Sequence, residues 1–197
     1  KDALIVCDDA DLERATAAAN FGSFMHQGQI CMSVEKILVQ ESLFDAFLSR
    51  FVERATKLKV GDPTADKGHV IGPLINDKQA GKVKEQIDDA VAKGANVVLG
   101  GGVTGRFIEP TILTGVTPDM KIYAEETFGP VVPVIPFRTD KEAIAIANDS
   151  EFGLSSGVIT RDEARGLAIA SELDTGMCHI NCSSVNDEPH VPFGGTK

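Results

Sequence analysis

The sequence lacks the features that would mark a nucleic-acid-binding, membrane or secreted protein. It has no cluster of Lys and Arg, and its net charge of −10 over 197 residues argues against a nucleic-acid-binding surface. No apolar run approaches the ~20 residues that a membrane-spanning helix needs. No signal-peptide pattern opens the chain. We therefore expect a soluble, cytoplasmic protein with neither a nucleic-acid partner nor a membrane partner.

The composition is that of an ordinary globular protein. Hydrophobic residues make up 43% and charged residues 24% of the chain, which gives no compositional reason to expect disorder. A chain of 197 residues can bury a core as one domain. Its four cysteines, Cys7, Cys31, Cys178 and Cys182, are not spaced like a secreted disulfide framework, so we expect them to be reduced.

Two of these cysteines lie close together in a strand-like stretch. Cys178 and Cys182 flank His179 in MCHINC. Two interpretations stay open, a pair of packed cysteines or half of a zinc site. We favour packing and predict no metal site.

Strand-like and helix-like patterns alternate along the chain. We expect strands at 4–7, 34–40, 96–101, 107–116, within 120–137, at 155–160 and at 177–181, and helices at 10–24, 43–58, 77–94, 141–149 and 161–172. This order predicts an α/β fold of three layers, an open and mostly parallel sheet with helices on both faces. Asp8 or Asp9 should cap the first helix and Ser42 the second. Pro133 and Pro136 indicate an edge strand or an irregular segment.

The stretch from Phe24 to Ser33, FMHQGQICMS, places Cys31 between a predicted helix and a predicted strand. Gly28 can bring the backbone close to a ligand, since glycine has no Cβ. A thiol at such a junction can be both exposed and well positioned. From these residues alone, Cys31 is either a nucleophile or a small buried apolar residue.

Three segments, taken together and in this order, resemble the aldehyde dehydrogenase superfamily. GQIC at 28–31 resembles its active-site cysteine segment, EETFGPVVPV at 125–134 its E-x-F-G-P segment, and VPFGGTK at 191–197 its P-F-G-G-x-K segment. The resemblance covers the whole chain. QGQICMS and SSVNDEPHVPFGG are most similar to the bacterial branch that oxidises aromatic aldehydes such as benzaldehyde, salicylaldehyde or vanillin.

The resemblance implies a reaction and a set of site residues. Cys31 would attack the aldehyde, a hydride would pass to nicotinamide, and water would hydrolyse the resulting thioester. Glu126 would bind the nicotinamide ribose, Phe128 would pack beside the nicotinamide, and Gln79 and Lys82 would approach the cofactor ribose. Simpler alternatives are a surface Glu, a core Phe and a solvated polar helix face.

The resemblance also implies that parts of the enzyme lie outside the chain. No G-x-G-x-x-G segment is present, and Gly100 to Gly102 are better explained as a tight turn, so NAD or NADP would be bound mainly by a missing domain. The general base would lie upstream of Lys1, with the oxyanion-hole amide, and an oligomerisation strand would follow Lys197. We therefore expect residues 1–197 to be a catalytic domain truncated at both ends, inactive alone. The full-length protein would be a homodimer or homotetramer acting on a small aldehyde.

Three alternative functions stay open at this point. A thiol hydrolase would need a histidine near Cys31, for which His26, His179 and His190 are candidates. A CoA-acylating aldehyde dehydrogenase would form the same thioester and pass it to another thiol. A non-catalytic interaction fragment is the third.

Overall fold

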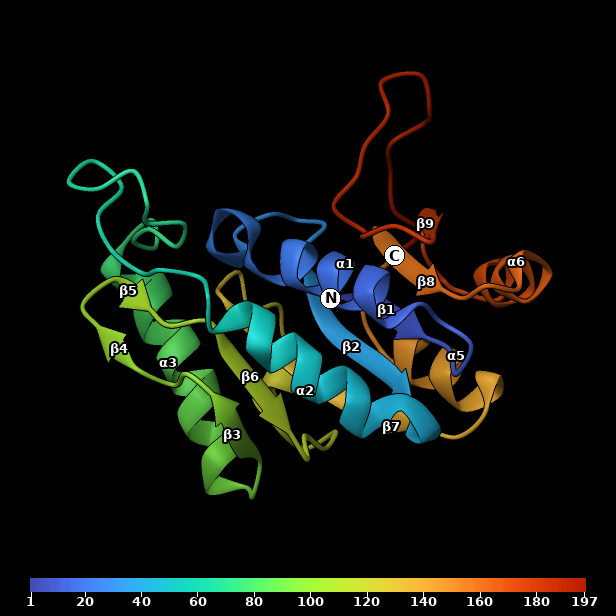
Figure 1. Cartoon of the computed structure of the whole chain (residues 1–197), viewed down its shortest axis with the longest axis horizontal. Helices are drawn as coiled ribbons and strands as arrows, with labels where there is room; N and C mark the ends of the chain where they lie inside the picture. The colour runs from blue at the N-terminus through green and yellow to red at the C-terminus, as the bar shows by residue number, and fades with distance from the viewer.

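The computed structural model describes residues 1–197 and confirms the α/β fold. One sheet has the strand order β3-β6-β7-β2-β1-β8-β9, in which only β3 and β6 are antiparallel neighbours (Figure 1). Its strands are β1 (Asp2–Val6), β2 (Val34–Gln40), β3 (Asn96–Leu99), β6 (Thr111–Thr114), β7 (Val131–Phe137), β8 (Ser155–Ile159) and β9 (Met177–Ile180). Strands β4 (Val103–Thr104) and β5 (Phe107–Ile108) form a separate hairpin.

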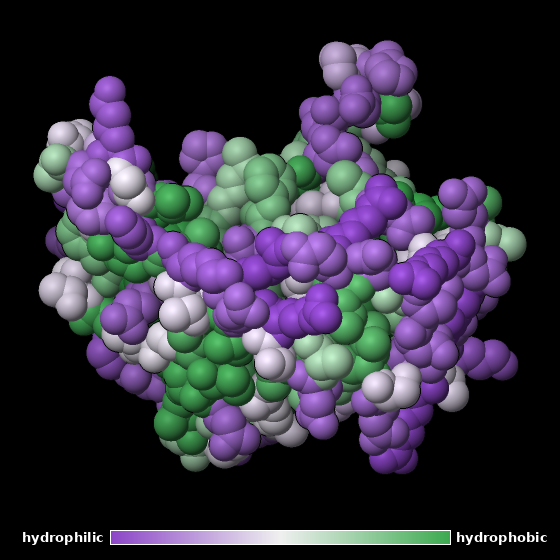
Figure 2. Space-filling model, in the orientation of Figure 1, coloured by the Kyte–Doolittle hydropathy of each residue, from purple (hydrophilic) through white to green (hydrophobic).

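Helices cover both faces of this sheet. They are α1 (Leu12–Phe24), α2 (Phe44–Ala55), α3 (Asp77–Ala92), α4 (Lys121–Ala124), α5 (Asp140–Asn148) and α6 (Glu163–Ser171), with the 3-10 turns η1 (Met25–Gly28) and η2 (Glu41–Leu43). Helices α1 and α2 lie in front of β2 in Figure 1. Hydrophilic residues cover their outer side in Figure 2, as expected for a layer that faces solvent. None of the helices combines the length and apolar character needed to cross a membrane.

The alternation of side chains along β1 shows why three layers form. Leu4 and Val6 belong to the core under α1 and α2, whereas Ala3, Ile5 and Cys7 belong to the core under α5 and α6. Successive strand residues point to opposite faces, so a strand that is apolar on both faces needs a cover on each side. A third apolar cluster lies between α3, α4 and the β6 end of the sheet.

Two of the predicted helix caps are wrong. The side chain that caps α1 is Asp11, which accepts a hydrogen bond from the Arg14 backbone N–H. Asp8 and Asp9 are instead bound by groups far away in sequence, described below. Ser42 caps nothing, because it lies inside the 3-10 turn η2, after which α2 begins without a side-chain cap.

The expectation of an edge strand around Pro133 and Pro136 is also wrong, since β7 is an interior strand between β6 and β2. Pro133 lies within the register shared with β6 but before the register with β2 begins at Val134. Pro136 lies within the register shared with β2 but beyond the last β6 partner. Each proline therefore has a strand partner on one side only, which is where a missing N–H is tolerated.

The parallel strands give the sheet two distinct edges. We call the edge from which β1, β2, β7, β8 and β9 start the amino edge, and the edge at which they end the carboxyl edge. The predicted site residues Cys31, Glu126 and Phe128 immediately precede β2 and β7. They therefore lie at the amino edge, although ligands of open α/β sheets more commonly bind at the carboxyl edge.

Candidate active site

Cys31 lies in an exposed turn that a run of left-handed residues creates. His26, Gln27 and Gly28 have φ values of 49°, 58° and 67°, which end the helical path of α1 and turn the chain toward β2. A short loop closed by the Ser33 N–H, which donates to the Ile30 carbonyl at 2.9 Å, then presents Cys31. The Cys31 backbone N–H makes no hydrogen bond within the chain, so it is free to donate to an oxyanion.

Gly28 allows the turn that carries Cys31 to pack closely against the second motif, EETFGPVVPV at 125–134. A Cβ placed on Gly28 would lie 2.3 Å from the carbonyl oxygen of Gly129. A Cβ on Gly129 would in turn lie 2.6 Å from a methyl group of Val83 on α3. The close approach predicted for Gly28 is thus found, but it is to the protein backbone and not to a ligand site. Two glycines therefore set the spacing between the Cys31 turn and the segment that carries Glu126 and Phe128.

The four cysteines are all free, and only Cys31 is exposed. Burial raises the pKa of Cys7 to about 12, and burial also raises that of Cys178. Cys182 is half-buried and lies beyond the end of β9, so the two cysteines around His179 do not share one strand as predicted. A thiol reacts as its thiolate, so Cys31 is the best-placed nucleophile among the four.

Glu126 and Phe128 are each half-buried. The Glu126 carboxylate makes no hydrogen bond or ion pair within the chain, and both of its oxygens can accept hydrogen bonds from a ligand. Phe128 has a φ of 48°, which is costly for an aromatic residue. Strained backbone of this kind gathers at functional sites and persists where neighbouring contacts impose it.

The segment between Glu126 and Phe128 separates two cavities. Glu126 and Lys82 line one of about 790 Å³, together with residues at the end of α5. Phe128 and Gln79 line another of about 500 Å³, together with Ile30, the residue before Cys31. The structure thus brings four of the predicted site residues to these two cavities, while Cys31 lines neither and is next to Ile30, which lines the second.

Gln79 has a second role that the sequence did not suggest. Its side-chain Nε2 donates to the carbonyl oxygens of Thr127 at 2.7 Å and Phe128 at 2.9 Å. Both hydrogens of the amide are therefore engaged, and only Oε1 is left to accept a hydrogen bond from a ribose hydroxyl. Lys82 makes no hydrogen bond or ion pair within the chain.

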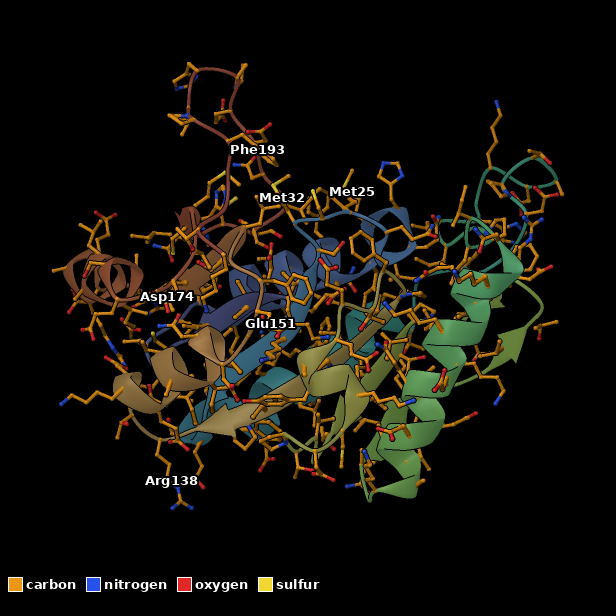
Figure 3. The ribbon with its side chains drawn as sticks, turned by 180° about the vertical axis from the view of Figure 1, so that it is seen from behind. Met25, Met32, Arg138, Glu151, Asp174 and Phe193 are labelled. Atoms are coloured by element: carbon orange, nitrogen blue, oxygen red, sulfur yellow. The ribbon has the colours of Figure 1, made fainter.

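The third motif, VPFGGTK at 191–197, also reaches the amino edge. After β9 the chain turns back, and Ser184 Oγ donates to the Met32 carbonyl at 2.8 Å. Figure 3 shows Met32 at the edge from which the C-terminal loop projects, with Phe193 at the base of that loop. Lys197 Nζ donates to the Asn148 and Ser150 carbonyls at 2.8 and 2.9 Å, beside the cavity that Glu126 lines.

No histidine supports a thiol hydrolase. His26 is exposed in the turn before Cys31, His179 lies on β9 and His190 lies in the exposed C-terminal loop. None of them makes a hydrogen bond to Cys31. Burial lowers the pKa of His179, against a smaller opposing effect of Asp187. A nucleophile and its base need hydrogen-bond contact, which these residues do not make.

Two buried charges beside the site were missed at the sequence level. Glu35, in β2, is 5% exposed and accepts hydrogen bonds from the backbone N–H groups of Thr127 and Phe128. Lys1 Nζ lies 3.2 Å from the second Glu35 oxygen. The available signal was the pair Glu35-Lys36 inside a strand that is otherwise apolar up to Gln40, because charges in a buried strand must find partners.

The sequence profile of the aldehyde dehydrogenase family matches residues 1–197. The chain belongs to this family. It is 46% identical to a vanillin dehydrogenase from Pseudomonas fluorescens over 194 residues, which are 98% of this chain and 40% of that protein. The chain thus spans about 40% of the length of the relatives that it matches.

Solved structures of the family agree with the fold. A salicylaldehyde dehydrogenase from Pseudomonas putida G7, crystallised with salicylaldehyde, is 48% identical and superposes with a TM-score of 0.97 over 100% of this chain and 41% of its own. A glyceraldehyde-3-phosphate dehydrogenase from Methanocaldococcus jannaschii, crystallised with NADP, is 40% identical, with a TM-score of 0.94 over 100% of this chain and 42% of its own. Relatives of this chain therefore bind an aromatic aldehyde in one case and NADP in the other.

Proposed function

We propose that this chain is the catalytic part of an NAD(P)-dependent aldehyde dehydrogenase that oxidises an aromatic aldehyde to the carboxylic acid. The observation that carries the proposal is the exposed Cys31 with a free backbone N–H, next to a half-buried segment with an unpaired Glu126 carboxylate. The aromatic substrate is supported by the vanillin and salicylaldehyde dehydrogenases to which the chain is similar.

In the first step the Cys31 thiolate attacks the aldehyde carbon. A sulfur–carbon bond forms, and the carbonyl electron pair moves to oxygen, where the Cys31 N–H donates to the developing charge. The aldehyde C–H bond then breaks, the C=O bond forms again, and the substrate leaves this step as a thioester on Cys31. NAD or NADP, when bound, supplies the acceptor for the hydride.

Glu126 and Phe128 would hold the cofactor for that step. Glu126 would accept hydrogen bonds from the ribose hydroxyls, and Phe128 would limit the position of the nicotinamide relative to Cys31. Lys82 and Gln79 Oε1 would contact the ribose from α3. The free Glu126 carboxylate and the cavities on both sides of the segment fit this arrangement.

Hydrolysis completes the reaction. Water adds to the thioester carbon and loses a proton to a general base, and the carbon–sulfur bond breaks, which releases the acid and returns the Cys31 thiolate. We assign the general base, the second oxyanion donor and most of the cofactor contacts to the part of the enzyme that this chain does not span. The cytoplasmic location and the homodimer or homotetramer stay predictions.

The experiment that tests this proposal compares two proteins. The full-length enzyme that contains this chain should form NADH or NADPH with benzaldehyde, salicylaldehyde or vanillin, and the purified 197-residue chain should form none. Addition of coenzyme A should not divert the product from the free acid to a thioester. Steady turnover by the chain alone, or loss of the aldehyde without cofactor reduction in the full-length enzyme, would disprove the proposal.

A further inference from the structure

The backbone between Thr127 and Phe128 is held from both sides by buried side chains. Glu35 Oε1 accepts from the Thr127 N–H at 2.8 Å and from the Phe128 N–H at 2.9 Å. Gln79 Nε2 donates to the carbonyl oxygens of the same two residues. All four polar backbone groups of this dipeptide are therefore bound by two side chains that come from β2 and α3.

The Glu35 side of this arrangement is itself fixed. The Glu35 side chain is 7% exposed, and its second oxygen lies 3.2 Å from Lys1 Nζ. Lys1 Nζ also donates to Thr127 Oγ1 at 3.3 Å. A buried carboxylate between an ammonium group and two N–H donors has little freedom to move, because hydrogen bonds to a charged acceptor are strong.

The held dipeptide is the one whose geometry matters most for the proposed reaction. Glu126 precedes it, and Phe128, its second residue, has the unfavourable φ of 48°. Without external contacts a phenylalanine would relax to negative φ, which would turn both the Phe128 ring and the Glu126 side chain. Glu35 fixes the peptide plane that carries the Phe128 N–H, and Gln79 fixes the plane that carries the Phe128 carbonyl, so the two side chains together hold the backbone torsions of Phe128.

We propose that Glu35 is a positioning residue for hydride transfer, because its carboxylate holds the Thr127–Phe128 peptide in the conformation that directs Glu126 and Phe128 at the cofactor. Glu35 touches neither substrate nor cofactor. The inference rests on the proposed function, since it concerns the residues to which that function assigns the nicotinamide.

The test measures the hydride step by single-turnover NADH formation in the full-length enzyme at saturating NAD+, with normal and formyl-deuterated benzaldehyde. Glu35→Ala should slow this step about a hundredfold, since a displacement on the order of 1 Å has that effect. The deuterium isotope effect should also increase. The nitrophenolate burst from 4-nitrophenyl acetate, which reports acylation of Cys31, should stay within about twofold of the parent enzyme because it needs no hydride transfer.

Two further variants separate positioning from stability. Glu35→Gln keeps an acceptor oxygen for the two N–H groups and should recover the hydride step to within about tenfold of the parent. Glu41→Ala removes an exposed carboxylate at the other end of β2, paired with Arg138, and should change neither rate nor isotope effect. Should Glu35→Ala fail to fold, Gln79→Met should show the slower hydride step and the larger isotope effect at saturating NAD+.

Several results would overturn the inference. A parental hydride rate and isotope effect in Glu35→Ala would show that the Thr127–Phe128 dipeptide keeps its conformation without the Glu35 hydrogen bonds. If Glu35→Ala does not fold, the same result in Gln79→Met would show this for the Gln79 hydrogen bonds. An equal loss of hydride-transfer rate in Glu35→Gln and Glu35→Ala would show that Glu35 has a general structural role. Loss of the nitrophenolate burst together with the hydride step would show the same. A parent enzyme with neither burst nor hydride transfer would remove the proposed function, and the inference with it.

Discussion

At the carboxyl edge of the sheet, Arg165 on α6 binds Asp140 through two nitrogens at 2.6 and 2.9 Å and Asp8 at 2.6 Å. At the amino edge, the Cys31 backbone N–H and the Glu126 carboxylate have no partner within the chain, and Phe128 is held in an unfavourable conformation. The carboxyl edge is thus satisfied by its own residues, whereas the amino edge has free donors, free acceptors and strain. These unsatisfied and strained groups support the proposal that the chemistry takes place at the amino edge.

The largest effect that this difference predicts is on Cys31. Cys31→Ala in the full-length enzyme should lower aldehyde oxidation at least about a thousandfold, because the covalent route is lost. Matched Ala variants of Cys7, Cys178 and Cys182 should keep most of the activity. In limited iodoacetamide labelling, Cys31 should react first, since it is the exposed cysteine. Faster labelling of another cysteine would contradict the assignment of Cys31 at the amino edge as the reactive thiol.

The second effect concerns the free carboxylate of the amino edge. Glu126→Gln should slow the hydride step on the order of a hundredfold and increase the isotope effect with deuterated aldehyde, because weaker bonds to the ribose let the nicotinamide move. The melting temperature should hardly change, since the Glu126 carboxylate pairs with nothing in the chain. Unchanged kcat and isotope effect in this variant would make Glu126 an ordinary surface residue.

The carboxyl edge should respond in the opposite way. Arg165→Met removes the group that ties α6 to Asp140 and to the loop after β1, so the full-length enzyme should lose about 1–3 kcal/mol of stability. The loss should be visible as a lower Tm of the full-length enzyme. The hydride rate and the isotope effect should stay at their parental values. A slower hydride step with an unchanged Tm would mean that the two edges are not separate in role.

The smallest effect is a pH dependence of folding stability that arises from Asp9 at the carboxyl edge. Partial burial alone would raise the pKa of Asp9, but its hydrogen bonds from Thr160, Asp162 and Arg161 outweigh this and lower it. The folded-state pKa then lies below the unfolded one. The stabilisation is present above the ordinary carboxyl pKa of about 4 and is lost as the pH falls through the lowered value.

Asp9→Ala removes that group and gives the matched comparison. The variant should unfold more easily than the parent at pH 7, and the gap between their melting temperatures should narrow on acidification below about pH 4. A gap that stays constant from pH 7 to about pH 3 would show that Asp9 does not contribute through its charge.

Local patterns predicted the elements of the fold well. Apolar runs predicted β1 and β2, and the recurring phenylalanines predicted α2, whose Phe47 and Phe51 are fully buried. Long-range contacts were not predictable in this way. Asp8 and Asp9 look as suitable for a cap as Asp11, and only the distant Arg165 and Thr160 take them out of that role.

In the candidate site, too, local motifs were predictable from the sequence and long-range contacts were not. Its three motifs were recognisable by resemblance, and the structure places all of them at the amino edge. Gly28 and Gly129 bring the first two motifs into contact, and Glu35 accepts a hydrogen bond from the Phe128 N–H. Both contacts join segments that are far apart in sequence. Nothing in local spacing reports such contacts. A charged pair in a buried strand was the only sign that the sequence carried of the Glu35 contact.

The most direct test of the account is the location of the acyl group during turnover. Full-length enzyme mixed with salicylaldehyde and NAD+ and then quenched in acid should carry one salicyloyl group per chain, and peptide mass spectrometry should place it on the peptide with Cys31. The group should be absent when NAD+ is omitted, because the thioester forms only after hydride transfer. A salicyloyl group on Cys178 or Cys182, or no acyl group at all during active turnover, would contradict the assignment of the amino edge as the catalytic edge.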